Sequence, residues 1–225
     1  MIAALTVLRP AREQTEKTLG SLTRDFVSGN RFIFTHAGLA FVFVAMAMAM
    51  FVLSSFSPLI SIYIRDSLNA GTRAFGAISS MVGLGLMAGT QLVNCLVRSR
   101  SKPHVVVTGL LGLGMGAAIL GLFHNIPIAA LSTFIMGFTI SFVLVPAQTM
   151  SQQETPPPMI GRVSSSFMSL ISFAQVFGLL LSGYLAQRLG IRPLFLASAG
   201  LLAMIAGTGY LMIRGTSVHA RATAP

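Results

Sequence analysis

The sequence predicts an all-α membrane protein whose six transmembrane helices form two triplets in a 3+3 inverted repeat. Its composition, its apolar runs and an internal repeat carry this prediction. Hydrophobic residues make up 54% of the 225 residues and charged residues only 9%, which is far from the balance of a soluble domain. Because backbone groups in lipid must be paired within the protein, we expect helices as the spanning elements.

Six apolar runs are long enough to cross a bilayer core, which takes about 20 helical residues. Short connections that hold proline, glycine, asparagine or charge separate them. We expect a transmembrane bundle over residues 36–214. Its predicted spans are 38–63, 74–97, 104–123, 126–149, 163–186 and 193–213.

The two flanking segments differ from the bundle. Residues 1–8, MIAALTVL, are apolar but too short to span, and they lack the charged start of a signal peptide. We interpret residues 1–35 as the stub of a preceding span followed by a cytoplasmic linker; an unstructured tail is the alternative. Residues 215–225 are expected to be a cytoplasmic tail.

The basic residues predict the orientation. With a cytoplasmic N-terminus, eleven of the 15 Lys and Arg residues fall on the cytoplasmic side and four outside, as the positive-inside rule requires. Both termini are therefore expected in the cytoplasm. The formal charge of +10 is scattered between apolar runs, which argues against a nucleic-acid partner.

An internal repeat relates the two halves of the bundle. A shift of 90 residues lays the first three runs onto the last three, and it pairs Arg98 with Arg188, Lys102 with Arg192, and Pro103 with Pro193. Because three is an odd number of crossings, equivalent loops fall on opposite sides of the membrane. Inverted triplets of this kind build many secondary transporters.

Two runs, SLTRDFVSGNRF and GRVSSSFMSLISFAQVFGLLLSGYLAQRLGIRPLF, resemble the C-terminal half of a major facilitator superfamily transporter. The branch that they resemble is drug and siderophore efflux, which includes the enterobactin exporter and macrolide efflux proteins. The matching motif residues are Asp25, Gly29, Pro158, Gly161, Arg162, Val163, Gly178, Gly183, Gly190, Arg192 and Pro193. The resemblance covers nearly the whole chain.

The resemblance implies one half of the major facilitator fold. It implies part of a secondary active transporter that exports a small amphipathic or apolar compound by alternating access, without a cofactor and driven by an ion gradient, expected to be of protons. The implied partners are a small-molecule substrate, the lipid bilayer and a six-span N-terminal half. The implied location is the cell membrane, as a multi-pass protein of the bacterial inner membrane.

Two competing classes follow from what the spans contain. The predicted spans hold no Asp, Glu, Lys or Arg, whereas an ion-coupled pump needs a titratable group in the membrane. A non-transporting truncated membrane fragment is therefore the alternative. An intramembrane enzyme is not expected, because all four histidines fall at span ends or in loops and neither nucleophile nor metal-ligand spacing is present.

Polar residues inside the spans are the first candidates for a substrate cavity, because each needs a partner or water. The resemblance implies that the first, second, fourth and fifth spans line the cavity. Of the polar set Gln91, Asn94, Thr133, Thr139, Ser169, Ser172 and Gln175, we select Gln91, Thr139 and Gln175. Met50, Phe56 and Ser57 are added, because flexible thioethers and aromatic rings suit varied apolar ligands. Core or lipid-facing packing is the alternative for these three.

A polar stretch, PAQTMSQQETPPPMIGRVSSS at 146–166, interrupts the apolar chain. We expect Gln148 and Glu154 to cap the fourth span, the prolines to stop it, and Gly161-Arg162 to turn the chain into the fifth. The resemblance implies a cytoplasmic gate in which Arg162 bonds helix-end carbonyls or a carboxylate. An ordinary positive-inside anchor is the alternative.

Glycines are dense in the second and third spans. Gly85 with Gly89, and Gly112 with Gly116, have GxxxG spacing. Small residues let membrane helices approach closely. We predict close helix packing at both pairs.

Overall fold

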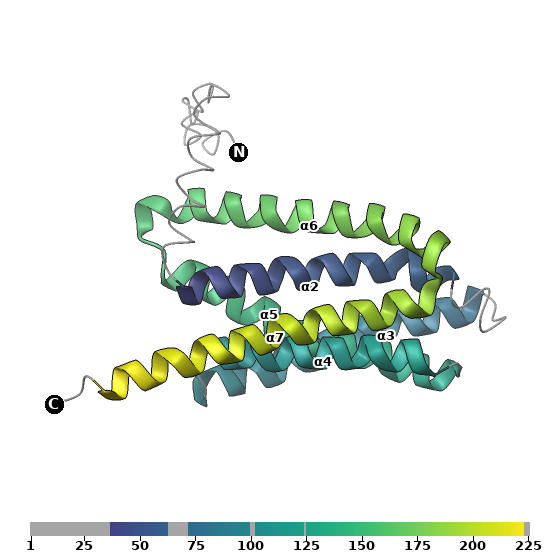
Figure 1. Ribbon diagram of the computed structural model, residues 1–225, viewed down its shortest axis with the longest axis horizontal. Coiled ribbons are helices and arrows are strands. Elements are labelled where there is room, and N and C mark those ends of the chain that lie inside the picture. Colours follow the sequence, from purple (N-terminus) through teal and green to yellow (C-terminus); the bar gives the residue numbers. More distant parts are fainter. Residues whose placement is uncertain (1–36, 63–71, 100–101, 124, 223–225) are drawn as a thin grey trace, which may run out of the picture.

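The computed structural model describes residues 37–62, 72–99, 102–123 and 125–222, which form helices joined by short turns (Figure 1). Six of these helices are long and apolar enough to cross a membrane. They are α2 (Ala37–Ile62), α3 (Thr72–Ser99), α4 (Lys102–Leu122), α5 (Ile126–Gln153), α6 (Ile160–Leu189) and α7 (Ile191–Ala222). The predicted segment 1–35, with Asp25 and Gly29, lies outside the described residues.

The helices extend the predicted spans by a turn or so at most ends. Arg73, Lys102, Arg188 and Arg192 therefore lie in terminal helical turns, where long basic side chains can reach the membrane surface. The largest extension is at the end of the chain, where α7 continues to Ala222.

The turn between α5 and α6 differs from the prediction. Glu154 stands at the C-cap position of α5, as predicted, and its backbone N–H donates to the Met150 carbonyl at 3.0 Å. A 3-10 turn, Pro157–Met159, then leads directly into α6. Gly161 and Arg162 already belong to the first turn of α6, so the prediction that they turn the chain is wrong. The consecutive prolines make the turn upstream of them, because proline cannot continue the hydrogen bonding of α5.

The two triplets exchange partners. α2 packs mainly on α6, α5 packs mainly on α3, and α4 packs on α7, while the consecutive helices α2 and α3 scarcely touch. The first helix of each triplet thus packs on the second helix of the other, as expected of two related triplets. One contact breaks the symmetry: α4 packs extensively on α5, but the equivalent pair, α7 and α2, meets only at a few points.

The α2–α6 pair and the α3–α5 pair cross at the same kinds of residue. A Cβ added to Gly178 of α6 would meet the Phe51 carbonyl and the Ser54 hydroxyl of α2. A Cβ added to Gly89 of α3 would meet the Phe138 carbonyl and the Ser141 hydroxyl of α5. Each crossing therefore sets a Phe-x-x-Ser segment on a glycine.

Glycine packing and hydroxyl bonds hold the bundle together. Gly85 and Gly89 bring α3 against the backbone of α5, and Gly112 and Gly116 bring α4 against side chains of α5, so the predicted packing role of both pairs is confirmed. Several hydroxyls donate to backbone carbonyls of neighbouring helices, which strengthens association where lipid supplies no hydrophobic force. These bonds are Ser54 to Gln175 (3.0 Å), Ser55 to Gly178 (3.0 Å) and Ser132 to Gly116 (2.5 Å).

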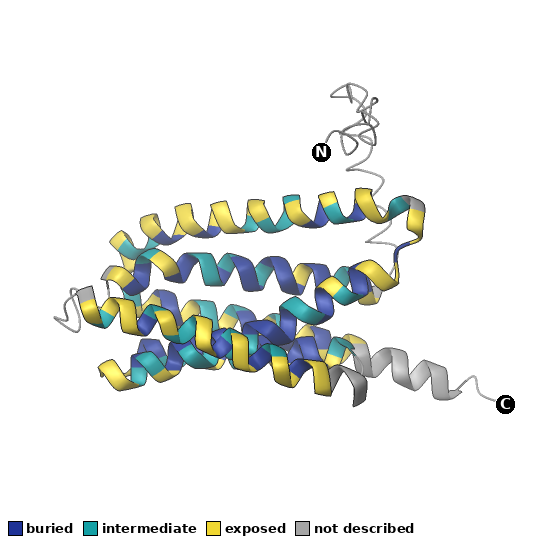
Figure 2. Cartoon of the chain, turned by 180° about the vertical axis from the view of Figure 1, so that it is seen from behind, coloured by how far each residue is buried: buried dark blue, intermediate teal, exposed yellow. Residues whose placement is uncertain are grey.

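Burial is uneven across the bundle (Figure 2). In the spanning windows of α2 and α4, 61% of residues are buried inside the protein, against 22% for α3 and 11% for α6. In Figure 1, α6 lies along one edge with α2 beneath it. α2 begins and α7 ends at the end of the bundle that holds the α5–α6 turn (the α5–α6 end); the opposite end, where α6 meets α7, is called the α6–α7 end.

Candidate functional site

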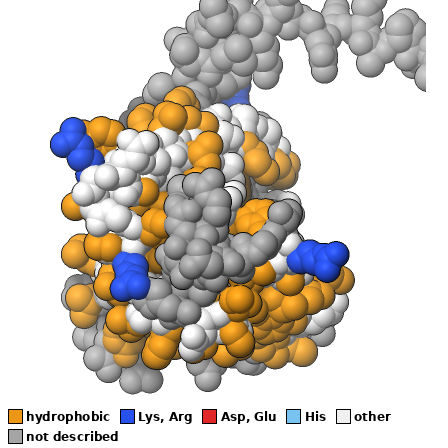
Figure 3. All heavy atoms as spheres, turned by 90° about the vertical axis from the view of Figure 1, so that its right-hand side faces the viewer, with side chains coloured by type: hydrophobic (Ala, Val, Ile, Leu, Met, Phe, Trp, Pro, Cys, Tyr) orange, Lys and Arg blue, Asp and Glu red, His pale blue; other side chains and the backbone are white. Residues whose placement is uncertain are grey.

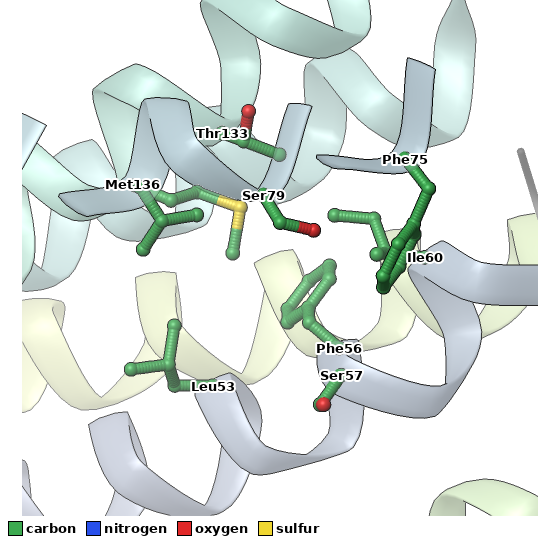
Figure 4. A pocket seen from close by; sticks show the side chains of 9 residues that line it. Leu53, Phe56, Ser57, Ile60, Phe75, Ser79, Thr133 and Met136 are labelled. Atoms are coloured by element: carbon green, nitrogen blue, oxygen red, sulfur yellow. The ribbon is translucent and has the colours of Figure 1, made fainter. Parts of the chain in front are cut away.

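A cavity of about 280 Å³ lies between α2, α3 and α5 (Figure 4). It is set towards the α6–α7 end, because its lining comes from the last third of α2 and the first turns of α3 and α5. The nine lining residues are Leu53, Phe56, Ser57, Ile60, Phe75, Ser79, Val82, Thr133 and Met136. None of them is charged, so the cavity favours an uncharged, apolar ligand or part of one.

Three hydroxyls belong to this cavity, and they differ in what they can offer a ligand. Thr133 lies within hydrogen-bond distance of the carbonyls of Ala129 and Ala130 in its own turn, and of Ile78 across in α3 at 3.2 Å. In Figure 4 its methyl group, not its hydroxyl, is turned to the cavity. Ser57 and Ser79 have no hydrogen-bond partner among the residues that the structure describes, and Ser79 points into the cavity.

The cavity brings together two of the predicted residues, Phe56 and Ser57. Phe56 is held by an almost parallel stack on Phe195 of α7, with ring centroids 4.9 Å apart. Ser57 is exposed beside it. Phe56 therefore forms a rigid wall of the cavity and Ser57 a part of its polar rim.

Met50 and Gln175 form a second pair, away from this cavity. The Gln175 amide of α6 donates to the Met50 sulfur of α2 at 3.6 Å. Gln175 is otherwise exposed on the open edge of the bundle. Nearby, Met168, Ser169, Ser172, Phe173 and Val176 line an open hollow of about 390 Å³ on α6.

The remaining two cavity candidates lie elsewhere. Gln91 is exposed on α3. Thr139 packs its methyl group on Gly112 of α4, and its hydroxyl donates back to the Ile135 carbonyl at 2.8 Å. Neither residue is among those that line the cavity.

The predicted gate residues, Arg162, Gln148 and Glu154, are all exposed at the α5–α6 end. Arg162 lies in the first turn of α6, and Glu154 directly follows α5. Sequence reasoning missed a neighbouring contact at this end: Lys102, the first residue of α4, donates to the side-chain oxygen of Gln153. That contact ties the start of α4 to the end of α5.

Sequence reasoning also missed Phe75, Ser79 and Met136. Phe75, Ser79 and Val82 recur at helical spacing on α3, so the periodicity of that helix could have singled out its cavity face. No group of three or more His, Cys, Asp or Glu side chains that could hold a metal ion is found in the described part of the chain.

Comparison with known proteins agrees with this architecture. Macrolide efflux protein A of Streptococcus pyogenes, and the protein of the same name from a serotype M6 strain, are each 25% identical to the chain over 213 residues. The alignment covers 92% of this chain and 52% of each relative, so the chain spans about half the length of the curated relatives it matches. The Major Facilitator Superfamily pattern matches residues 39–224. The chain is therefore a member of the Major Facilitator Superfamily.

Proposed function

We propose that the chain forms one half of a secondary active transporter that exports small amphipathic or apolar compounds by alternating access. The observation that carries the proposal is the uncharged cavity between α2, α3 and α5, in which aromatic and aliphatic side chains surround the unpaired hydroxyls of Ser57 and Ser79. Such a surface binds apolar area without requiring one particular ligand. The two relatives are named for macrolide efflux, so a macrolide is the first substrate to test.

The other half of the transporter would be a six-span N-terminal bundle, in the same polypeptide or a separate one. Its proposed docking side includes the exposed faces of α3 and α6, the two helices with the smallest buried share of their spanning windows. With that bundle in place, the exposed Gln175 and Gln91 would face a central cavity and not lipid. Both residues are therefore kept as proposed cavity residues.

The proposed driving force is an ion gradient, with protons as the expected ion. In the membrane-crossing windows of the described helices, charged residues stand only in terminal turns. We therefore assign the titratable group that coupling requires to the N-terminal bundle. The proposed location is the bacterial inner membrane with both termini in the cytoplasm, which makes the α5–α6 end cytoplasmic and Arg162 part of its gate.

The test uses the chain co-expressed with a matching six-span N-terminal half in cells that lack their own macrolide exporters. Ser79→Leu would fill the cavity and remove a free hydroxyl, so macrolide export should fall about tenfold or more. Ser80→Leu is the matched control, because Ser80 is the next residue on α3 but lies outside the cavity lining and is exposed. Both variants are compared at equal membrane abundance.

The outcomes separate the two parts of the proposal. Uncoupler-sensitive export that falls in Ser79→Leu and persists in Ser80→Leu supports the cavity as a substrate site. Equal export in both variants would remove the cavity from the mechanism while leaving the transporter. No gradient-dependent export of any tested compound from the two halves together would instead favour the non-transporting fragment.

A further inference from the structure

A second cavity, of about 250 Å³, lies between α6, α7 and α2. Its walls are largely aliphatic, with Leu181 and Leu185 on α6 and Leu194 and Leu201 on α7. α6 and α7 make few contacts with each other, so the cavity is a crevice between two neighbouring helices. It belongs to the α6–α7 end, because it uses the last third of α6 and the first turns of α7.

The polar groups of this crevice are mostly satisfied within the protein. The Ser55 hydroxyl donates to the carbonyls of Phe51 (2.8 Å) and Gly178 (3.0 Å). The Ser182 hydroxyl donates to the Leu179 carbonyl at 2.9 Å. Because these donors are already bonded, the crevice presents a hydrocarbon-like wall, and an apolar cavity of about 150 Å³ is already large enough to hold a benzene ring.

Two arginines lie at the same end of the bundle as the crevice. Arg188 lies one turn beyond Leu185, and Arg192 lies two residues before Leu194, on either side of the turn at Gly190, whose φ of 83° suits glycine. The guanidinium of Arg188 lies over the exposed ring of Tyr184, 5.5 Å from its centroid, and tyrosine favours the membrane–water interface. At 1.5 Å per residue, Leu181 lies about 10 Å below Arg188.

Neither arginine has an ion-pair partner in the described part of the chain. The only acidic residue there is Glu154, at the opposite end of the molecule; Asp66 falls in the connection at 63–71, outside the described residues. Figure 3 shows the α6–α7 end, with basic side chains at its rim among hydrophobic ones and no described acidic side chain in view. Among the described residues, the two arginines therefore have no counter-ion at the end of the bundle that holds the apolar crevice.

We propose that this crevice is a binding site for an anionic phospholipid. Arg188 and Arg192 hold the phosphate headgroup at the membrane surface, and one acyl chain lies between α6 and α7 against the leucines. A phospholipid matches both halves of the site, whereas a free anion would leave the crevice empty and an uncharged hydrocarbon would leave the arginines unpaired. The site is separate from the cavity between α2, α3 and α5 and does not depend on which compound is exported.

The test measures lipid preference at the crevice with a tryptophan reporter. The chain contains no tryptophan, so Tyr184→Trp places a single fluorophore beside Arg188. Purified chain is reconstituted in phosphatidylcholine bilayers that contain a rising fraction of a quenching lipid. The quenching lipid is either brominated phosphatidylglycerol or brominated phosphatidylcholine, each brominated on its acyl chains. Leu131→Trp is the control reporter, because Leu131 is exposed on α5 and lies five positions from its helix end, as Tyr184 does.

We expect brominated phosphatidylglycerol to quench the reporter at position 184 at a several-fold lower fraction than brominated phosphatidylcholine, since one basic residue near the surface favours anionic lipid about fivefold. The control reporter at position 131 should not distinguish the two lipids. Adding Arg188→Gln and Arg192→Gln should abolish the preference. Adding Ser198→Phe, which fills the crevice between the leucines, should also abolish it if the acyl chain occupies that space.

Equal quenching by the two lipids at position 184 would overturn the proposal. A preference that survives the double arginine change would also overturn it, because the headgroup contact would not be the cause. A preference that survives Ser198→Phe would show a headgroup contact alone and refute the seating of the acyl chain. Circular dichroism of each variant confirms retained helix before the lipids are compared.

Discussion

The contact between α3 and α5 at Gly89 provides the sharpest test of the fold. A Cβ added at Gly89 would overlap the Phe138 carbonyl oxygen and the Ser141 hydroxyl and would stand 3.0 Å from the Phe138 carbonyl carbon. Backbone atoms of a packed helix cannot turn away as a flexible side chain can, so Gly89→Ala forces α3 away from α5. Gly83 lies on the same helix with nothing within 4 Å of its added Cβ, which makes Gly83→Ala the matched control.

The magnitude follows from two opposing terms. Overpacking costs about 1–3 kcal/mol, and a clash with backbone belongs at the upper limit. Alanine in place of glycine in a helix returns about 1 kcal/mol. Gly89→Ala should therefore lose about 2 kcal/mol and Gly83→Ala gain about 1 kcal/mol. For a chain of 225 residues, these changes correspond to a Tm about 4–8 °C lower and 2–4 °C higher, respectively.

Thermal unfolding of the purified chain in a single detergent, followed by circular dichroism, measures the difference. Each variant adds one methyl group to the same helix, so detergent and helix propensity affect the two variants alike. If Gly89→Ala melts at or above the temperature of Gly83→Ala, the close approach of α3 and α5 at this crossing is wrong.

Two further predictions concern single side chains. In the two-half transporter, Arg162→Ala should reduce export about tenfold or more at unchanged membrane abundance, because a charge-assisted bond at the proposed gate is lost. Export by Arg162→Lys should be intermediate, because lysine lacks the planar fork of arginine. Unchanged export in the alanine variant would leave only the anchor interpretation. Ser55→Ala removes the bond from α2 to the Gly178 carbonyl and should lower the free energy of unfolding by about 0.6 kcal/mol. Ser80→Ala removes a bond within α3 alone and should leave the Tm unchanged. Equal effects of the two changes would contradict the interhelical bond.

The sequence was sufficient to predict the six helices and the glycine pairs at their crossings, because span length and small-residue spacing are local properties of the chain. It did not predict which helices meet. Met50 and Gln175 were selected separately as cavity residues and proved to contact each other across 125 residues, because α2 packs on α6 and not on its neighbour α3. Ser79 and Met136 were missed for the same reason, since their cavity exists only where α2, α3 and α5 converge.

The register of the repeat also required the structure. The Phe-x-x-Ser segments at Phe51 and Phe138 are 87 residues apart, and the glycines they cross, Gly89 and Gly178, are 89 apart. The predicted shift of 90 was therefore right in its order of helices and slightly wrong in its offset for the first two pairs. The helices account for the drift, because Phe138 lies 15 residues before the end of α5, whereas Phe51 lies only 11 before the end of α2.

With that register, the two ends of the bundle can be compared. The cavity residues Phe56 and Ile60 of α2 correspond to the smaller Val143 and Ala147 of α5, and all four are buried.

At the α5–α6 end, the rings of Phe43 and Phe167 lie 4.5 Å apart. At the α6–α7 end, the register places the smaller Ala130 and Ile78 at the equivalent positions. The crossings are alike, yet the side chains beside them differ in size. The repeat is therefore preserved where the helices approach most closely and lost in the side chains around the crossings.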